Sequence, residues 1–167
     1  MDPNIMDVVA NAGTVVNSPQ LFLGLLGIGL MVAIAAVGSG LGVLAAGLAA
    51  VGGWKKCNKA NKPLPMTLVA VTGMPISQTL YGFILLLQMV AIPKQVIADN
   101  AGLLLGYGIG TGIALALSAF AQGKIGAAAC DALVDDSKGF ANYLMVLGIA
   151  ETVALFAMVF TMINLPS

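Results

Sequence analysis

Glu151 stands out because it is the only glutamate of the chain and lies in one of its most apolar segments. The stretch from Ala141 to Leu165 is long enough to cross a bilayer and contains no basic residue that could neutralise the carboxylate. A charge at the centre of a membrane helix costs roughly 3 to above 10 kcal/mol, so acids at such positions are usually functional. We therefore expect Glu151 to bind an ion.

Three further polar side chains are expected at the same depth as Glu151. If the polar connections of two helical hairpins form the turns, Gln122 and Glu151 each lie about fifteen residues, or roughly 20 Å, from the second turn. Ser77 and Gln78 lie at nearly the same distance from the first turn. We call these four residues the oxygen layer. The alternative for Ser77, Gln78 and Gln122 is that they only hold helices together by hydrogen bonds.

Pro75 and Tyr81 flank the polar residues of this span. A proline inside a helix removes one donor and clashes with the carbonyl four residues earlier, so Pro75 is expected to kink the helix and to free nearby carbonyls as ligands. Tyr81 is four residues after Ser77, on about the same face, and could donate a hydrogen bond to a carboxylate.

The chemistry of the oxygen layer favours a hard, monovalent cation. It offers hydroxyl, amide and carboxylate oxygens but no sulfur or imidazole. A single carboxylate balances a single positive charge, which indicates Na⁺. A proton is the alternative, because a desolvated carboxyl holds a proton with little help. A salt bridge from Lys124 to Glu151 is disfavoured, since Lys124 lies about 200° around the helix from Gln122.

The composition predicts an all-α membrane protein. Of its 167 residues 59% are hydrophobic and 8% charged, and the mean hydropathy is +1.00. Apart from Glu151, four long segments have no charged side chain, namely residues 8–54, 63–93, 100–123 and 139–167. They predict four transmembrane helices. The absence of net charge, Arg and His argues against nucleic-acid binding. Cys57 and Cys130 are not spaced as metal ligands.

The four helices are expected to form two tandem hairpins. The first loop carries four lysines and no acid, which places it in the cytoplasm and both termini outside the cell membrane. The acidic, polar start of the chain is not expected to be a cleavable signal peptide. The predicted segments are an extracytoplasmic N-terminal segment (1–20), a first hairpin (21–93, loop about 54–64), an external loop (94–101) and a second hairpin (102–167, loop about 132–140).

The two hairpins resemble an internal duplication. Aligning Gly73 with Gly148 sets Ile76 opposite Glu151, so that one half has lost the acid. The first helix of each hairpin contains small residues that allow close helix contact, which are Gly38 with Gly42 and Gly106 with Gly110. They serve either ordinary helix packing or tight packing inside a ring.

These residues are similar to the proteolipid, or c-type rotor subunit, of V-type ATPases, called subunit K in bacterial sodium pumps. The resemblance runs from about Leu21 to Leu165. It is most specific in MPISQTLYGF (74–83), AQGKIGAAA (121–129) and GIAETVAL (148–155), and in the 29-residue step from Gln122 to Glu151.

The resemblance implies a set of ion ligands, carried over by motif. They are the backbone carbonyl of Met74 and the side chains of Ser77, Gln78, Gln122 and Glu151, with Tyr81 hydrogen-bonded to Glu151. Ser77 stands where relatives have threonine and keeps the hydroxyl, and Met74 replaces the usual leucine where only the backbone is used.

The resemblance also implies a function and partners. Identical subunits in a lipid-embedded ring would turn against a stator subunit that supplies an arginine, and a central-stalk subunit would contact the cytoplasmic loops. Each subunit would carry one Na⁺ by reversible binding at Glu151, linked to ATP hydrolysis or synthesis elsewhere, and no catalytic site is expected on this chain. Alternatives are a proton-carrying ring, a small cation/proton antiporter and a purely structural proteolipid.

Overall fold

The computed structural model describes residues 18–136 and 138–167, and all regular elements in these ranges are helices. Their bounds are α2 Pro19–Lys59, α3 Thr67–Gly73, η1 Met74–Ile76, α4 Ser77–Val90, α5 Lys94–Asp99, α6 Ala101–Asp135 and α7 Phe140–Ile163. Four spans are long and apolar enough to cross a membrane: α2, the composite span Thr67–Val90, α6 and α7. The predicted all-α fold with four membrane helices is confirmed.

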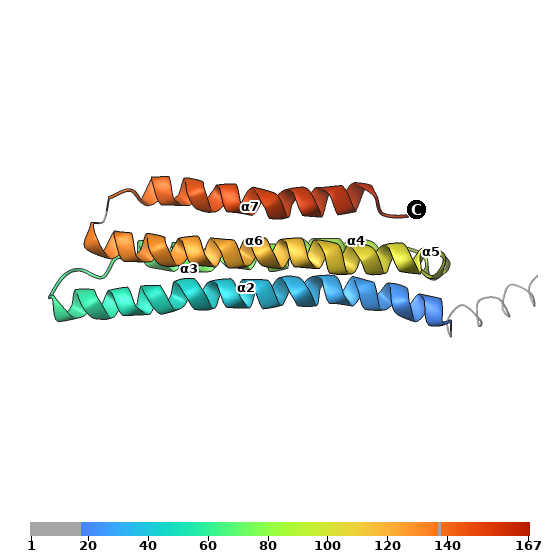
Figure 1. Ribbon diagram of the computed structural model, residues 1–167, viewed down its shortest axis with the longest axis horizontal. Helices are drawn as coiled ribbons and strands as arrows, with labels where there is room; N and C mark the ends of the chain where they lie inside the picture. The colour runs from blue at the N-terminus through green and yellow to red at the C-terminus, as the bar shows by residue number, and fades with distance from the viewer. Residues whose placement is uncertain (1–17, 137) are drawn as a thin grey trace, which may run out of the picture.

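The helices form an elongated bundle in which α6 lies between α2 and α7. In Figure 1, α2, α6 and α7 run alongside one another, and the α3 to α4 span lies behind α6. In its most apolar window α7 is 17% buried, against 39% for α2 and for α6. Most of the surface of α7 is therefore left for lipid or for another chain.

Glycines bring α2 and α6 into backbone contact. A Cβ atom on Gly108 would collide with the backbone of Gly27, and one on Gly123 would collide with Gly42. Gly38 faces the backbone of Ala116 in the same way. Small residues let membrane helices approach this closely, so the glycines hold the two hairpins together as one unit.

Gly106 and Gly110 do not pack against another described helix of the same chain, so of the two predicted roles only packing inside a ring is left open. A Cβ atom on either glycine would meet no other atom within 4 Å, and both glycines are exposed. Gly108 and Gly112 face α2 instead. The segment contains two glycine pairs with the same spacing, Gly106 with Gly110 and Gly108 with Gly112. Only packing against α2 determines which of the two pairs faces inward.

The connections differ in detail from the predicted loops. Helix α2 continues to Lys59, inside the predicted loop 54–64, and the chain leaves the helix before the prolines of KPLP. The external connection contains the short helix α5, and the second turn narrows to residues 136–139. Of the predicted N-terminal segment, residues 1–17 lie outside the described residues. Ser18 Oγ caps α2 by accepting a hydrogen bond from the Leu21 amide at 3.1 Å.

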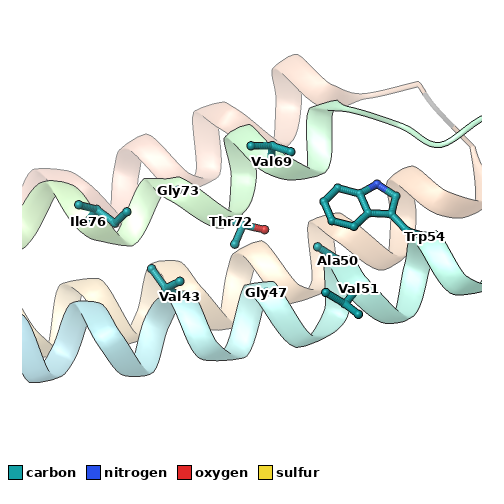
Figure 2. A pocket seen from close by; sticks show the side chains of 9 residues that line it. All are labelled: Val43, Gly47, Ala50, Val51, Trp54, Val69, Thr72, Gly73 and Ile76. Atoms are coloured by element: carbon teal, nitrogen blue, oxygen red, sulfur yellow. The ribbon is translucent and has the colours of Figure 1, made fainter.

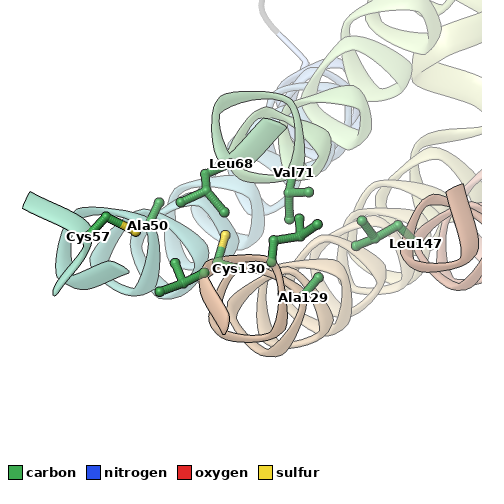
Figure 3. Close-up of a cluster of buried hydrophobic side chains, with 9 residues drawn as sticks. Ala50, Cys57, Leu68, Val71, Ala129, Cys130 and Leu147 are labelled. Carbon is green, nitrogen blue, oxygen red and sulfur yellow. The ribbon is translucent and has the colours of Figure 1, made fainter. Parts of the chain in front are cut away.

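A buried apolar cluster joins the hairpins at the end of the bundle where both turns lie (Figure 3). Its members are Ala50, Cys57, Leu68, Val71, Ala129, Cys130, Leu133, Val134 and Leu147. Both cysteines are buried free thiols in this cluster. At the same end, Lys56 Nζ forms an exposed ion pair with Asp135 Oδ1 at 2.9 Å.

Candidate ion-binding site

The second span changes its helical form at Pro75. The chain forms a single 3₁₀ turn, η1, between α3 and α4. Because a proline cannot donate to the helix and its ring crowds the preceding turn, the regular α-helical pattern is interrupted here. The Ser77 hydroxyl donates to the Met74 carbonyl at 3.0 Å. The interruption thus gives this carbonyl a side-chain partner at the start of α4.

Three oxygens gather at this turn. Ser77 Oγ lies 3.0 Å from the Met74 carbonyl and 3.2 Å from Gln78 Oε1. A serine hydroxyl has one hydrogen, so it can satisfy only one of these two acceptors fully at a time. The cluster is accordingly rich in lone pairs and poor in hydrogens.

Two buried glutamines connect the turn to the second hairpin. Gln78 Nε2 donates to Gln122 Oε1 at 3.0 Å, and Gln122 Nε2 donates to the Leu147 carbonyl at 3.0 Å. Neither glutamine exposes any measurable surface, since both have relative exposures of 0%. This pair links α4 through α6 to α7.

Ser118 belongs to the same network, although the spacing of the polar residues did not predict it. Its Oγ accepts a hydrogen bond from Gln78 Nε2 at 3.3 Å and donates to the Ala150 carbonyl at 2.7 Å. The sequence signal was its position four residues before Gln122, one helical turn away on the same face.

Glu151 lies partly buried at the edge of this network. Tyr81 donates its hydroxyl hydrogen to Glu151 Oε1, with an oxygen–oxygen distance of 2.5 Å. The amide network binds α7 through the carbonyls of Leu147 and Ala150, which lie four residues and one residue before the acid. The structure therefore joins four of the predicted residues, Met74, Ser77, Gln78 and Gln122, in one network and pairs Tyr81 with Glu151 beside it. Among the described residues, the carboxylate itself forms no hydrogen bond with the network.

Comparison with known proteins shows what the chain is similar to. Residues 105–164, which cover α7 and most of α6, match the family of the ATP synthase C subunit. The chain is thus similar to this family over its second hairpin. It is also similar to the A-type ATP synthase subunit K of Methanocaldococcus jannaschii, with 29% identity over 146 residues. That alignment covers 87% of this chain, and the chain spans 62% of the length of that relative.

Glu151 has no lysine partner among the described residues. The ion pairs found there join Lys56 with Asp135 and Lys138 with Asp136. Lys124 is exposed. In the same described ranges, no three His, Cys, Asp or Glu side chains are grouped so that they could hold a metal.

The first hairpin has an apolar surface at the position that aligns with Glu151. Ile76 lines a groove of about 290 Å³ between α2 and the α3 to η1 segment (Figure 2). Val43, Val51 and Val69 line the same groove, and Trp54 closes one end by donating its indole N–H to the Pro65 carbonyl at 3.0 Å. No charged side chain lines it.

Proposed function

We propose that this chain is the membrane rotor subunit of a V/A-type rotary ATPase and that it carries one Na⁺ at Glu151. The family match and the likeness to a subunit K support the rotor role. The observation that carries the sodium assignment is the cluster of oxygens from Met74, Ser77 and Gln78 at the start of α4, the helix whose Tyr81 is hydrogen-bonded to Glu151.

The oxygen cluster suits a small hard cation. Ser77 Oγ, the Met74 carbonyl and Gln78 Oε1 share a single hydroxyl hydrogen. If a cation takes the place of this hydrogen, the three oxygens can coordinate it without any change in the backbone of α4. The adjacent Gln122 oxygen and the Glu151 carboxylate complete the proposed ligand set.

The single carboxylate sets the charge of the cargo. Glu151 with one bound Na⁺ is neutral, and the pair can then face lipid at a much lower cost than the free carboxylate. The hydrogen bond from Tyr81 holds the carboxylate in the orientation in which it would meet the ion. Occupancy would therefore decide when Glu151 can turn into the bilayer.

Proton transport is the second candidate, and the Tyr81 contact favours it. A protonated Glu151 held by Tyr81 would be neutral without any help from the glutamines. The two candidates differ in whether Ser77, Gln78 and Gln122 act as ligands or as packing contacts.

The assembly in this proposal is a ring of identical subunits in the cell membrane. The long exposed face of α7 is available to lipid and to a stator subunit, whose arginine would hold the empty Glu151 carboxylate. The lysine-rich turn after α2 would face the cytoplasm and the central stalk, and both termini would lie outside. ATP is hydrolysed or made elsewhere in the complex, and this chain catalyses no reaction.

The decisive experiment measures how fast a carboxyl-reactive carbodiimide labels Glu151, with and without Na⁺, across a pH series. The protein is purified in mild detergent, and K⁺ replaces Na⁺ at constant ionic strength as the control. We expect Na⁺, but not K⁺, to slow the labelling at constant pH. The Glu151→Gln variant supplies the blank for labelling elsewhere on the chain.

The labelling result separates the candidates. If only pH changes the labelling rate, Glu151 carries a proton and the sodium proposal fails. The oligomeric state of the same preparation tests the rotor role, because a stable homo-oligomeric ring supports it. A monomer or dimer that binds lipophilic cations would favour a small antiporter instead.

A further inference from the structure

We propose that Ser118 is a positioning residue that fixes the side-chain amide of Gln78 so that its oxygen, and not its nitrogen, faces the cation. This inference rests on the proposed sodium site and deepens it. Ser118 itself would not touch the ion, because its hydroxyl is engaged on both sides by other groups.

The contacts of Gln78 use both hydrogens of its amide. One N–H points to Gln122 Oε1 at 3.0 Å and the other to Ser118 Oγ at 3.3 Å. The amide oxygen is left on the opposite side, where it meets Ser77 Oγ at 3.2 Å. The orientation of one amide thus decides whether the cluster at the 3₁₀ turn contains an oxygen or an N–H₂ group.

Reversal of the Gln78 amide is opposed by two anchors on α7. Gln122 donates to the Leu147 carbonyl, so its own oxygen points at Gln78 and would meet another oxygen after a flip. Ser118 donates its only hydroxyl hydrogen to the Ala150 carbonyl, so it has none left for a flipped Gln78 oxygen. Both anchored side chains present acceptors to Gln78, and the flipped amide would face two oxygens.

The hydrogen bonds among Ser118, Gln78 and Gln122 are shielded from water. Ser118 is 4% exposed, and the two glutamines are fully buried. A lost hydrogen bond is therefore not replaced by solvent, and a hydroxyl deleted from Ser118 leaves one Gln78 N–H without a partner. The flipped and unflipped amides then differ less in energy, and the oxygen is presented to the cation for a smaller share of the time.

This role predicts an effect on sodium and none on protons. Proton binding at Glu151 uses the carboxyl group and Tyr81, and neither is hydrogen-bonded to Ser118. Sodium binding uses the Gln78 oxygen. A merely structural role for Ser118 would disturb both ions together, because it would shift α7 as a whole.

The test compares Ser118→Ala with Ser118→Thr, which keeps a hydroxyl, and with Ser39→Ala. Ser39 is a matched control because it is 5% exposed and accepts an interhelical hydrogen bond from Thr79 Oγ1 at 2.8 Å, outside the proposed site. For each full-length protein in detergent, two quantities are measured by carbodiimide labelling of Glu151. They are the Na⁺ concentration that halves the rate at fixed pH and the pH midpoint without Na⁺.

We expect Ser118→Ala to raise the half-protecting Na⁺ concentration about tenfold, as the loss of one buried hydrogen bond would, and to leave the pH midpoint unchanged. Ser118→Thr should restore protection, and Ser39→Ala should behave like the unchanged protein. The inference is overturned if Ser118→Ala matches Ser39→Ala, or if it shifts both quantities. If the unchanged protein shows no Na⁺ protection, the proposed sodium function itself fails, which is a different and recognisable result.

Discussion

The two hairpins share a layout but differ at the aligned positions Ile76 and Glu151. In the second hairpin, α7 presents a carboxylate that Tyr81 holds at 2.5 Å. In the first hairpin, Ile76 is 49% exposed and lines an apolar groove. The helix α4 nevertheless contributes Ser77, Gln78 and Tyr81 to the site of the second hairpin.

This difference shows that the halves have become complementary. The first hairpin lacks an acid and provides neutral oxygen donors, while the second provides the only glutamate together with Gln122. In the proposed function, one site serves four membrane helices, instead of one for each hairpin. Fewer ions per helix leave more driving force for each ion, and moving one charge costs about 2.3 kcal/mol per 100 mV.

The largest effect is expected from Glu151→Gln, which leaves both hairpins without a carboxylate at the aligned positions. We expect loss of ion transport and of the associated ATPase activity, because an amide carries no negative charge to balance a bound Na⁺ or to pair with a stator arginine. Membrane insertion should be unchanged, since the amide oxygen can still accept from Tyr81. Sodium uptake into vesicles containing the whole complex measures the effect, and retained uptake would contradict the role of Glu151.

The contact that makes the hairpins one unit is tested by Gly108→Ala. The added methyl group would collide with the backbone of Gly27, so α2 and α6 must separate, and we expect a destabilisation of about 1 to 3 kcal/mol. Gly110→Ala is the matched control, because its methyl group meets no atom of this chain within 4 Å. Thermal unfolding in detergent, followed by circular dichroism, should show a lower midpoint for Gly108→Ala only. Equal midpoints would contradict the close contact.

The link from the first hairpin to the acid is tested by Tyr81→Phe. This change removes the hydroxyl that donates to Glu151 and keeps the ring. A hydrogen bond to a charged group contributes about 1.5 to 3 kcal/mol, so the half-protecting Na⁺ concentration should rise at least about tenfold. The carbodiimide assay with Na⁺ measures the shift. An unchanged value would mean that Tyr81 does not act on the bound state.

The smallest effect on sodium is expected from Ile76→Glu, which restores an acid to the first hairpin. The new carboxylate would lie in a groove lined by valines, with no glutamine in its lining. We expect a second carbodiimide-reactive site whose labelling follows pH and ignores Na⁺. Peptide mapping of the labelled protein separates it from Glu151, and sodium protection at residue 76 would show that the acid alone is sufficient.

Much of the site was predictable because the number of residues between a turn and a helical position sets the depth of that position in the membrane. The polar positions lie at similar distances from the turns, and the structure joins Ser77, Gln78 and Gln122 by hydrogen bonds. Pro75 marked the change of helical form, since its ring cannot fit an unbroken helix. Ser118 was not predicted, because one serine in an apolar helix differs little from the other small residues that pack there.

By itself, the sequence determined that this is a membrane protein of four helices, since lengths and charges are local properties. It also determined that a single carboxylate must be neutralised within the bilayer. Only the tertiary structure decided which glycine register of α6 faces α2 and which way the Gln78 amide points. Both depend on partners far away in the chain, and the hydrogen bonds of a buried amide are fixed only when those partners are in place.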